Sequence, residues 1–173
     1  MTSIIKVNEI QDAGGNTILS SNGTGTFTSN LPNNTPAFEV KKTSDQSVST
    51  GTLTQVTFDT EIFDTDNAFS SNTFTVPAGK NGKYYFYSTV HFRTSTDNVL
   101  DSSIIYIYKN GAEYKKVLFS GGDENVYGLG IDATMELAVG DTIKIYGLLN
   151  ASSGTLSFYS SYTTYFGGYK LIE

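Results

Sequence analysis

The sequence lacks several residue types on which common kinds of site depend. It has no cysteine and no tryptophan, one histidine and three prolines among its 173 residues. A chain without cysteine forms no disulfide and no thiolate metal site, and one histidine is too few for a zinc site. Charged residues make up only 16% of the chain, against roughly 25% in an average globular protein. We therefore expect Ser, Thr, Asn and Gly to form much of the surface.

The charge balance limits the partners that the chain can bind. Its formal net charge is −6, and its only close basic pairs are Lys41-Lys42 and Lys115-Lys116, which we expect to be solvated strand ends. Nucleic-acid binding requires clustered Lys and Arg, so no nucleic-acid partner is expected. No apolar run approaches the roughly 18 residues of a membrane span, so membrane insertion is not expected either.

What the sequence has in abundance is the pattern of β-strands. Runs of alternating apolar and polar residues, rich in Val, Ile, Tyr, Phe and Thr, are separated by Asn-Gly, Gly-Gly and Gly-Asp. Helix patterns with a cap and a stop are nearly absent. The pattern predicts an all-β sandwich or barrel, with its strongest hairpin signal at Asn110-Gly111. The expected strands after residue 36 are 37–42, 54–58, 73–76, 83–93, 102–109, 113–120, 127–138, 142–149, 156–162 and 165–172.

Residues 1–33 differ from the rest of the chain. Residues 2–10 alternate as one short strand, a turn follows, and residues 18–30 give one or two weak strands. This segment has few large apolar residues to bury, so we expect it to pair with copies of itself or to dock on a partner. The linker is expected at Leu31–Pro36, which contains two prolines. Residues 34–173 are then the main domain.

One expected strand carries large side chains on both of its faces. The segment Asn81–Arg93 (NGKYYFYSTVHFR) holds five aromatic residues and the only histidine. Because successive side chains of a strand point to opposite faces, one set is apolar enough for a core. The other set is amphipathic, which suits a subunit interface or a ligand groove; a tyrosine-rich face open to solvent is the alternative. The core set is Tyr84, Phe86, Ser88, Val90 and Phe92, and the second set is Tyr85, Tyr87, Thr89, His91 and Arg93.

Five segments, taken in order, resemble a known family. They are AFEV (37–40), a run with the order Phe, Phe-Asp, Phe, Phe, Pro, Gly-x-Tyr-x-Phe (56–90), YIYKNG (106–111), LAVGDTIKIY (137–146) and YFGGYKLI (165–172). This order resembles the globular head of the q subunit of the first complement component, within the tumour-necrosis-factor-like superfamily. The match covers roughly residues 36–173. It departs at Gly167-Gly168, where the family usually has one glycine.

The resemblance implies a ten-strand jelly-roll sandwich that assembles as a compact homotrimer. In that family the strand matching residues 83–93 lies in the inner sheet, whose outer face meets the three-fold axis. By implication Tyr85, Tyr87, Thr89 and His91 approach neighbouring subunits. The family's functions are recognition and adhesion, so no enzymatic activity is expected.

The first residues carry a second resemblance. The segment 3–28 is similar to the starts of many predicted bacteriophage fibre and virion proteins that precede such heads. The N-terminus lacks the basic start and long apolar core of a secretory signal peptide, so release by lysis within a virus particle is an expected route out of a cell. The leading hypothesis is a trimeric phage structural protein, exposed on the particle as a tail or head fibre or a capsid decoration. Residues 1–33 would bind other virion proteins, and the head would bind a host surface, receptor or glycan.

Three loops are the expected binding surface, because a rigid sandwich displays its functional groups on loops. They are rich in Ser, Asn, Asp and Gly and span Thr94–Asp101, Gly121–Asn125 and Asn150–Gly154. A stand-alone carbohydrate-binding module is the alternative function for the same loops. The candidate residues are Thr94, Asp97, Asp101, Asp123, Glu124 and Asn150.

The acidic pairs and the histidine are the candidates for catalysis and metal binding. No Gly-x-Ser-x-Gly elbow accompanies His91, so a packing or interface role is favoured over that of a catalytic base. A glycoside hydrolase, a less favoured alternative, would need two carboxylates flanking a groove. No cofactor is expected; calcium remains possible at acidic loops, although the Gly and Glu of an EF-hand are absent. The acidic pairs are Asp64 with Asp66, Asp97 with Asp101, and Asp123 with Glu124; the calcium candidates are the first and third pairs.

Overall fold

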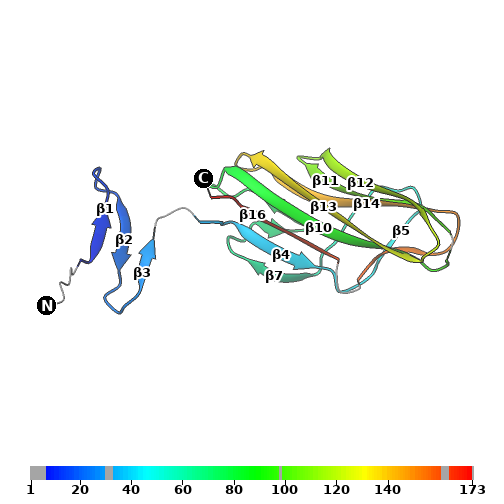
Figure 1. Cartoon of the computed structure of the whole chain (residues 1–173), viewed down its shortest axis with the longest axis horizontal. Coiled ribbons are helices and arrows are strands. Elements are labelled where there is room, and N and C mark those ends of the chain that lie inside the picture. The colour runs from blue at the N-terminus through cyan, green and yellow to red at the C-terminus, as the bar shows by residue number, and fades with distance from the viewer. Residues whose placement is uncertain (1–6, 30–32, 98, 161–163, 173) are drawn as a thin grey trace. The chain divides into compact units, whose positions relative to one another are not determined.

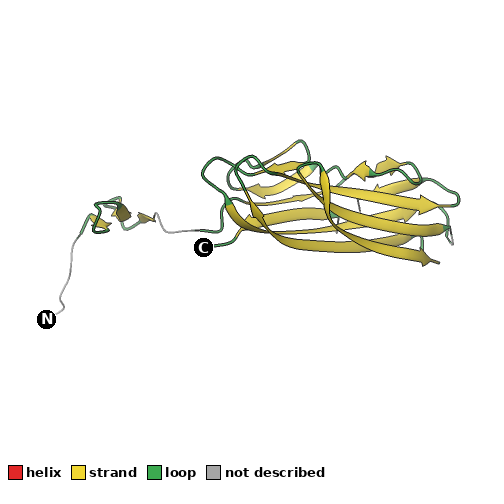
Figure 2. Ribbon diagram, turned by 90° about the horizontal axis from the view of Figure 1, so that it is seen from above, coloured by secondary structure: helices red, strands yellow, loops and turns green. Residues whose placement is uncertain are grey.

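The computed structural model describes residues 7–29, 33–97, 99–160 and 164–172 of the chain. Two compact units are formed, residues 1–33 and residues 34–173. Every regular element within the described residues is a β-strand (Figures 1 and 2), as the alternating sequence pattern predicts. No helix long and apolar enough to cross a membrane occurs in the described part of the chain.

The N-terminal unit is a three-stranded antiparallel sheet. Its strands β1 (Glu9–Gln11), β2 (Thr17–Ser21) and β3 (Phe27–Ser29) lie in that order. The Asp12 carboxylate accepts hydrogen bonds from the backbone N–H groups of Gly14 and Asn16, at 2.8 and 2.9 Å, and this closes the first turn. Of the strand expected at residues 2–10, only its end is seen as β1, and residues 2–6 lie outside the described residues. One or two weak strands were expected in the segment 18–30, and two are found, β2 beginning one residue earlier, at Thr17.

The second unit, here called the head, has two antiparallel sheets. The centre of the seven-stranded sheet is β10, which pairs with β13 along one side. On its other side β10 pairs first with β16, which is followed by β4 and β7. Further along that same side β10 pairs with β15, and β15 pairs with β5. Its strands are β4 (Ala37–Lys41), β5 (Gln46–Val48), β7 (Thr60–Asp64), β10 (Gly82–Thr94), β13 (Val126–Leu137), β15 (Leu156–Tyr159) and β16 (Tyr165–Lys170).

The six-stranded sheet has the order β12-β11-β14-β9-β8, and β6 also pairs with β14. The hairpin predicted at Asn110-Gly111 joins β11 and β12, and both residues have the positive φ angles that this turn requires, 53° and 81°. The strands are β6 (Thr54–Gln55), β8 (Phe69–Ser70), β9 (Thr73–Thr75), β11 (Leu100–Lys109), β12 (Ala112–Gly122) and β14 (Thr142–Ala151).

The core lies between the two sheets and is rich in phenylalanine. The ring of Phe38 stacks on that of Phe74 at 5.2 Å and meets the edge of Phe166 at 5.0 Å, while Phe86 meets Phe74 at 5.1 Å. All four side chains are fully buried. Burial of each such side chain contributes about 1.5–3 kcal/mol to folding. The alternation of β10 is as predicted, because Tyr84, Phe86, Ser88, Val90 and Phe92 all face this core.

Three strands of the head were not expected from the sequence: β5, β7 and β8. They are short, and β7 lies at a sheet edge where Ile62 and Phe63 are 49% and 43% exposed. A β-bulge interrupts the pairing of β7 with β4, and the two large apolar residues of β7, Ile62 and Phe63, are adjacent instead of alternating. The expected strand 54–58 is shorter, ending at Gln55, and residues 161 and 162 of the expected strand 156–162 lie outside the described residues.

Lys42 is a second departure from expectation. Lys41 is exposed as predicted, but Lys42 is only 4% exposed. Its ammonium donates to the backbone oxygen and the hydroxyl of Thr57, at 3.0 and 2.9 Å. Burial lowers the pKa of Lys42, and nearby Asp59 and Asp45 oppose that effect. The pair therefore consists of one solvated and one structural lysine, because the alternation of β4 continues into Lys42, the residue after the strand, and turns its side chain to the buried side.

Candidate functional site

The first candidate surface is the face of the seven-stranded sheet that points away from the core. We call it the β10 face, and it consists of Tyr85, Tyr87, Thr89 and His91 of β10 with Tyr165 and Tyr169 of β16. All six side chains are half-buried within the single chain. The face therefore offers large aromatic surfaces with polar tips, the composition that subunit interfaces favour.

The tyrosines of the β10 face support one another across the strands. Tyr85 lies opposite Tyr169, with ring centroids 5.7 Å apart, and Tyr87 packs on Tyr165 at 6.0 Å. Gly167 lies opposite Tyr87, and a Cβ there would come within 2.5 Å of the Tyr87 ring. On the core side, a Cβ at Gly168 would come within 2.4 Å of Phe86. The glycine pair that departs from the family pattern thus lets two aromatic rings of β10 lie flat against β16.

A hydrogen bond fixes Tyr87 within this face. Its hydroxyl donates to the Glu39 carboxylate at 2.8 Å. Burial, together with this hydrogen bond to an anion, raises the pKa of Tyr87 well above its usual range. Tyr87 is therefore a neutral, oriented donor at any physiological pH, and its ring is held in place.

His91 is a half-buried member of the face. Burial lowers its pKa, because the charged imidazolium would lose hydration there. Gly128 of β13 lies opposite His91, and a Cβ at Gly128 would come within 2.7 Å of the imidazole Nε2. Arg93, the next residue on this face, is bound to Asp45 at 2.8 Å and lies 4.4 Å from the centroid of the Tyr159 ring. The lowered pKa favours the neutral form of His91 at neutral pH.

The second candidate surface is one end of the sandwich, which we call the loop end. The register brings the three predicted loops together at this end. Leu100 of the first loop lies opposite Gly122 of the second and Ala151 of the third. Arg93 and Val126, which adjoin the first and second loops, also lie opposite each other. Backbone hydrogen bonds join the loops: Ser95 N–H donates to Thr155 O at 2.9 Å, and Ser152 N–H donates to Val99 O at 3.0 Å. Segments more than 50 residues apart in sequence therefore form one continuous surface.

The predicted residues of the loop end have different roles in the structure. Asp97, Asp101, Asp123 and Glu124 are exposed and able to meet a ligand. Thr94 is not, because it is 2% exposed and its hydroxyl donates to Thr96 O at 2.7 Å. The amide of Asn150, which is half-buried, donates to the Ser102 hydroxyl at 2.9 Å. Thr94 and Asn150 thus hold the loops in shape.

A groove beside the loop end was missed from the sequence. It has a volume of about 470 Å³ and runs between β5 and the connection from β14 to β15. The Thr50 hydroxyl accepts from Ala151 N–H at 3.1 Å and ties the two walls together. The signal available in the sequence was the hydroxyl-rich run 47–54, but β5 itself was not predicted. The hydroxyl groups that line the groove belong to Ser47, Ser49, Thr50, Ser152, Ser153 and Thr155.

The acidic pairs considered for calcium do not form one site. Asp64 lies opposite Phe38, Phe38 lies opposite Gly168, and Gly168 lies opposite Phe86, so Asp64 is level with Phe86 across the sheet. The Asp123–Glu124 loop precedes Val126, which lies opposite Arg93 on the same strand as Phe86. Seven residues of strand separate these levels, which is about 23 Å. The Asp64 carboxylate accepts from the N–H groups of Ala68 and Phe69, at 3.0 and 2.7 Å. Asp66 forms an ion pair with Lys80 at 3.3 Å. Within the described residues, no three metal-ligating side chains gather.

The outer face of the six-stranded sheet also carries tyrosines, which were not predicted as site residues from the sequence. Tyr106 and Tyr146 lie directly opposite each other, and Tyr108 packs on Tyr146 with ring centroids 4.5 Å apart. The Lys116 ammonium lies 5.8 Å from the centroid of the Tyr106 ring. The alternating YIY run at 106–108 was the signal for this second aromatic face.

Comparison with known proteins shows the fold of the chain. No protein-family model and no curated protein sequence matches it. Among solved structures, the globular domain of the zebrafish complement 1qA protein matches with a TM-score of 0.57 and 15% identity, covering 79% of this chain and 97% of that one. Murine APRIL at pH 5.0 matches with a TM-score of 0.57 and 17% identity, covering 78% and 98%. The murine APRIL structure at pH 8.0 has the same TM-score and coverages, at 18% identity.

These likenesses confirm the predicted fold class. The head is a two-sheet, all-β jelly roll like the globular domains of complement-q and tumour-necrosis-factor-like proteins. The matched domains are covered almost completely, so the head contains a whole domain of this kind.

Proposed function

We propose that the protein is a non-enzymatic homotrimer whose three β10 faces meet around a common axis. The observation that carries the proposal is the β10 face itself, an aromatic, half-buried surface on a sheet whose other side is already covered by the core. A sheet with one solvated face normally shows polar residues there. Closing three such faces together would bury the rings of Tyr85 and Tyr87 and leave their hydroxyl groups to form hydrogen bonds. The fold class supports this arrangement, because jelly-roll heads of this kind typically form trimers.

We further propose that the homotrimer is a structural protein of a phage particle, as a tail fibre, head fibre or capsid decoration. Residues 1–33 attach it to other virion proteins, and the head is displayed outward. The support is the similarity of residues 3–28 to the starts of phage fibre proteins, and the separation of that segment as its own unit. Mass spectrometry of purified particles of the phage that carries the gene tests this directly. Absence of the protein from those particles would overturn the location.

The proposed task of the loop end is adhesion to a host surface, receptor or glycan. Exposed carboxylates at Asp97, Asp101, Asp123 and Glu124 lie at the same end of the sandwich as a groove lined with hydroxyl groups. Such groups pair well with the hydroxyl groups of sugars, since each acts as a directed hydrogen-bond acceptor or donor. A glycan array probed with the full chain is the test. The double variant Asp97→Asn with Asp101→Asn should lose at least tenfold in binding, whereas Asp64→Asn, far from this end, should not.

The groove also favours a second candidate, a carbohydrate-binding module that works without a virus particle. It predicts the same glycan binding but no association with particles. A glycoside hydrolase is the third and weakest candidate. Incubation of the chain with host polysaccharides would decide it, because release of reducing ends that is abolished by Asp123→Asn would displace the non-enzymatic proposal.

A further inference from the structure

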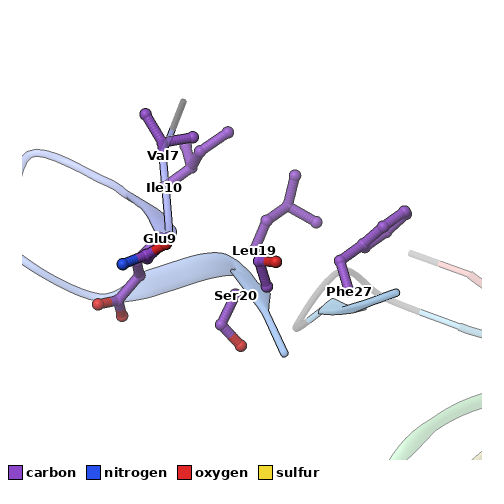
Figure 3. Close-up of a pocket in the computed structure, with 8 residues that line it drawn as sticks. Val7, Glu9, Ile10, Leu19, Ser20 and Phe27 are labelled. Carbon is purple, nitrogen blue, oxygen red and sulfur yellow. The ribbon is translucent and has the colours of Figure 1, made fainter. Parts of the chain in front are cut away.

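The N-terminal unit leaves an apolar surface uncovered. Val7, Ile10 and Phe27 are 53%, 45% and 69% exposed. They lie with Leu19 around a shallow hollow of about 180 Å³ (Figure 3). None of residues 7–27 is buried. The unit thus shows to solvent the side chains that a stable domain would enclose.

The register explains why Ile10, Leu19 and Phe27 share one side of the sheet, and Val7, which precedes β1, lies beside Ile10 (Figure 3). Ile10 lies directly opposite Leu19, and Phe27 lies opposite Ser21, two residues beyond Leu19 on β2. Residues two apart on a strand, and residues directly opposite on its neighbour, point to the same face. We call the surface of Val7, Ile10, Leu19 and Phe27 the apolar face. Ser20 points to the other side.

The unit is too small to be stable without a partner. Domains of fewer than about 40 residues usually need disulfides, a metal or oligomerisation. The chain has no cysteine, and no metal-binding group of three side chains occurs in its described part. Of these three sources, oligomerisation is the one that the sequence and the described residues leave open.

The charge and connection of the unit favour copies of itself as that partner. Its described residues hold two charged side chains, Glu9 and Asp12, and both are already hydrogen bonded, to Thr17 and to Asn16. Copies therefore repel each other little. Seven residues connect Ser29 to Ala37 and span at most about 25 Å. In a head homotrimer, tethers of this length hold the three units at an effective concentration near the millimolar range.

We propose that the N-terminal units of three chains associate through their apolar faces and form a short stem. This inference rests on the proposed homotrimer of heads, which supplies the high local concentration. The apolar face is then covered by second and third copies of this chain, and the attachment to other virion proteins uses other surfaces of residues 1–33.

The absence of cysteine allows a direct test with single substitutions in the full chain. Ser21→Cys places a thiol on the apolar face, and Ser20→Cys is the matched control, with the same chemical change one residue away on the opposite side. Under mild oxidation, Ser21→Cys should form disulfide-linked dimers at least tenfold faster than Ser20→Cys. Because the reaction occurs inside a trimer, its rate should not change on tenfold dilution. Sedimentation of the reduced protein is measured in parallel.

The outcomes separate the stem from the head trimer. Three chains per particle with selective, dilution-independent cross-linking of Ser21→Cys supports the stem. Three chains per particle with equal or no cross-linking in both variants overturns the stem and leaves the head trimer standing. A monomer by sedimentation overturns both proposals together.

A second measurement does not depend on oxidation. Leu19→Asp puts a charge on the apolar face, and Ser20→Asp puts the same charge on the other side. Limited proteolysis should cut residues 1–33 at least tenfold faster in Leu19→Asp than in Ser20→Asp, while the head remains trimeric. Equal cleavage rates in the two variants would contradict burial of the apolar face.

Discussion

The head and the N-terminal unit are built from the same kind of strand, yet only the head buries its aromatic residues. Phe86 is fully buried between two sheets, whereas Phe27 is 69% exposed on a single sheet. The difference does not lie in strand propensity, since both segments alternate and both form antiparallel pairs. It lies in the second layer: a sheet becomes a stable unit only when another surface covers its apolar side. The head supplies that layer itself, and in the proposed stem the N-terminal unit obtains it from other copies of the chain.

The largest expected effect is on the core of the head. Phe86→Ala removes a ring that packs on Phe74 and Phe166, and should lower the free energy of unfolding by about 3–5 kcal/mol. Phe27→Ala, the matched change in the N-terminal unit, should leave the unfolding of the head unchanged within about 0.5 kcal/mol. Denaturant unfolding followed by circular dichroism measures both. Equal losses would mean that the two units unfold as one.

The second prediction concerns the two outer faces of the head. Tyr85→Glu places three charges near the proposed axis and should weaken trimer association at least tenfold, because a buried charge without a partner is costly. Tyr146→Glu makes the same change on the outer face of the six-stranded sheet and should leave association unchanged. Sedimentation equilibrium across a dilution series measures the difference. Dissociation of the Tyr146→Glu protein alone would assign the interface to the other sheet.

The third prediction is a pH dependence carried by the only histidine. The pKa of His91 lies below its usual value in the folded chain because the ring is partly buried. His91 of the unfolded chain therefore gains its proton below a pH of about 6.5, where His91 of the folded chain is still neutral. Stability should therefore fall as the pH is lowered from 7 to 5.

The control for this prediction is His91→Gln, which cannot titrate in that range. Its stability should change less between pH 7 and pH 5 than that of the wild type, while losses from the carboxylates are shared by both proteins. If the two curves run parallel, the histidine is open to solvent in the assembled protein and does not lie in the trimer interface.

The smallest effect is expected from two buried serines of the head. The Ser88 hydroxyl donates to Tyr165 O at 2.7 Å, whereas the buried Ser103 hydroxyl has no hydrogen-bond partner among the described residues. Ser88→Ala should cost about 1 kcal/mol, and Ser103→Ala should be neutral or stabilise by about 1 kcal/mol. Thermal unfolding of both variants distinguishes them. A clear loss of stability in Ser103→Ala would indicate that its hydroxyl is satisfied, for example by a buried water.

The core-facing residues of the head could be predicted from the sequence, because the alternation of apolar and polar residues along a strand is a local pattern. From Tyr84 to Phe92 every second residue of β10 faces the core, all of them large and apolar or aromatic except Ser88, and the residues between them face outward as expected. Edge strands such as β7 were missed because they are half exposed, so no period-two pattern forms. The buried position of Lys42 was also missed, since its stability depends on Thr57, fifteen residues away.

The candidate surfaces could be predicted only in part. The residues of the three loops were identified by composition, but their meeting at one end depends on the long-range register of β10, β11, β12 and β14. Thr94 was assigned to a loop, but β10 extends to this residue, and the alternation of the strand places Thr94 on the core face. The role of Tyr85, Tyr87, Thr89 and His91 in a trimer stays a prediction, because it concerns contacts between chains.

Sedimentation of the full chain at micromolar concentration tests the central claim most directly. If the β10 faces meet around an axis, the particle should have three times the chain mass of 18.8 kDa. A stable particle with the mass of one chain would contradict the account, because the aromatic β10 face would then be an ordinary solvent-facing surface.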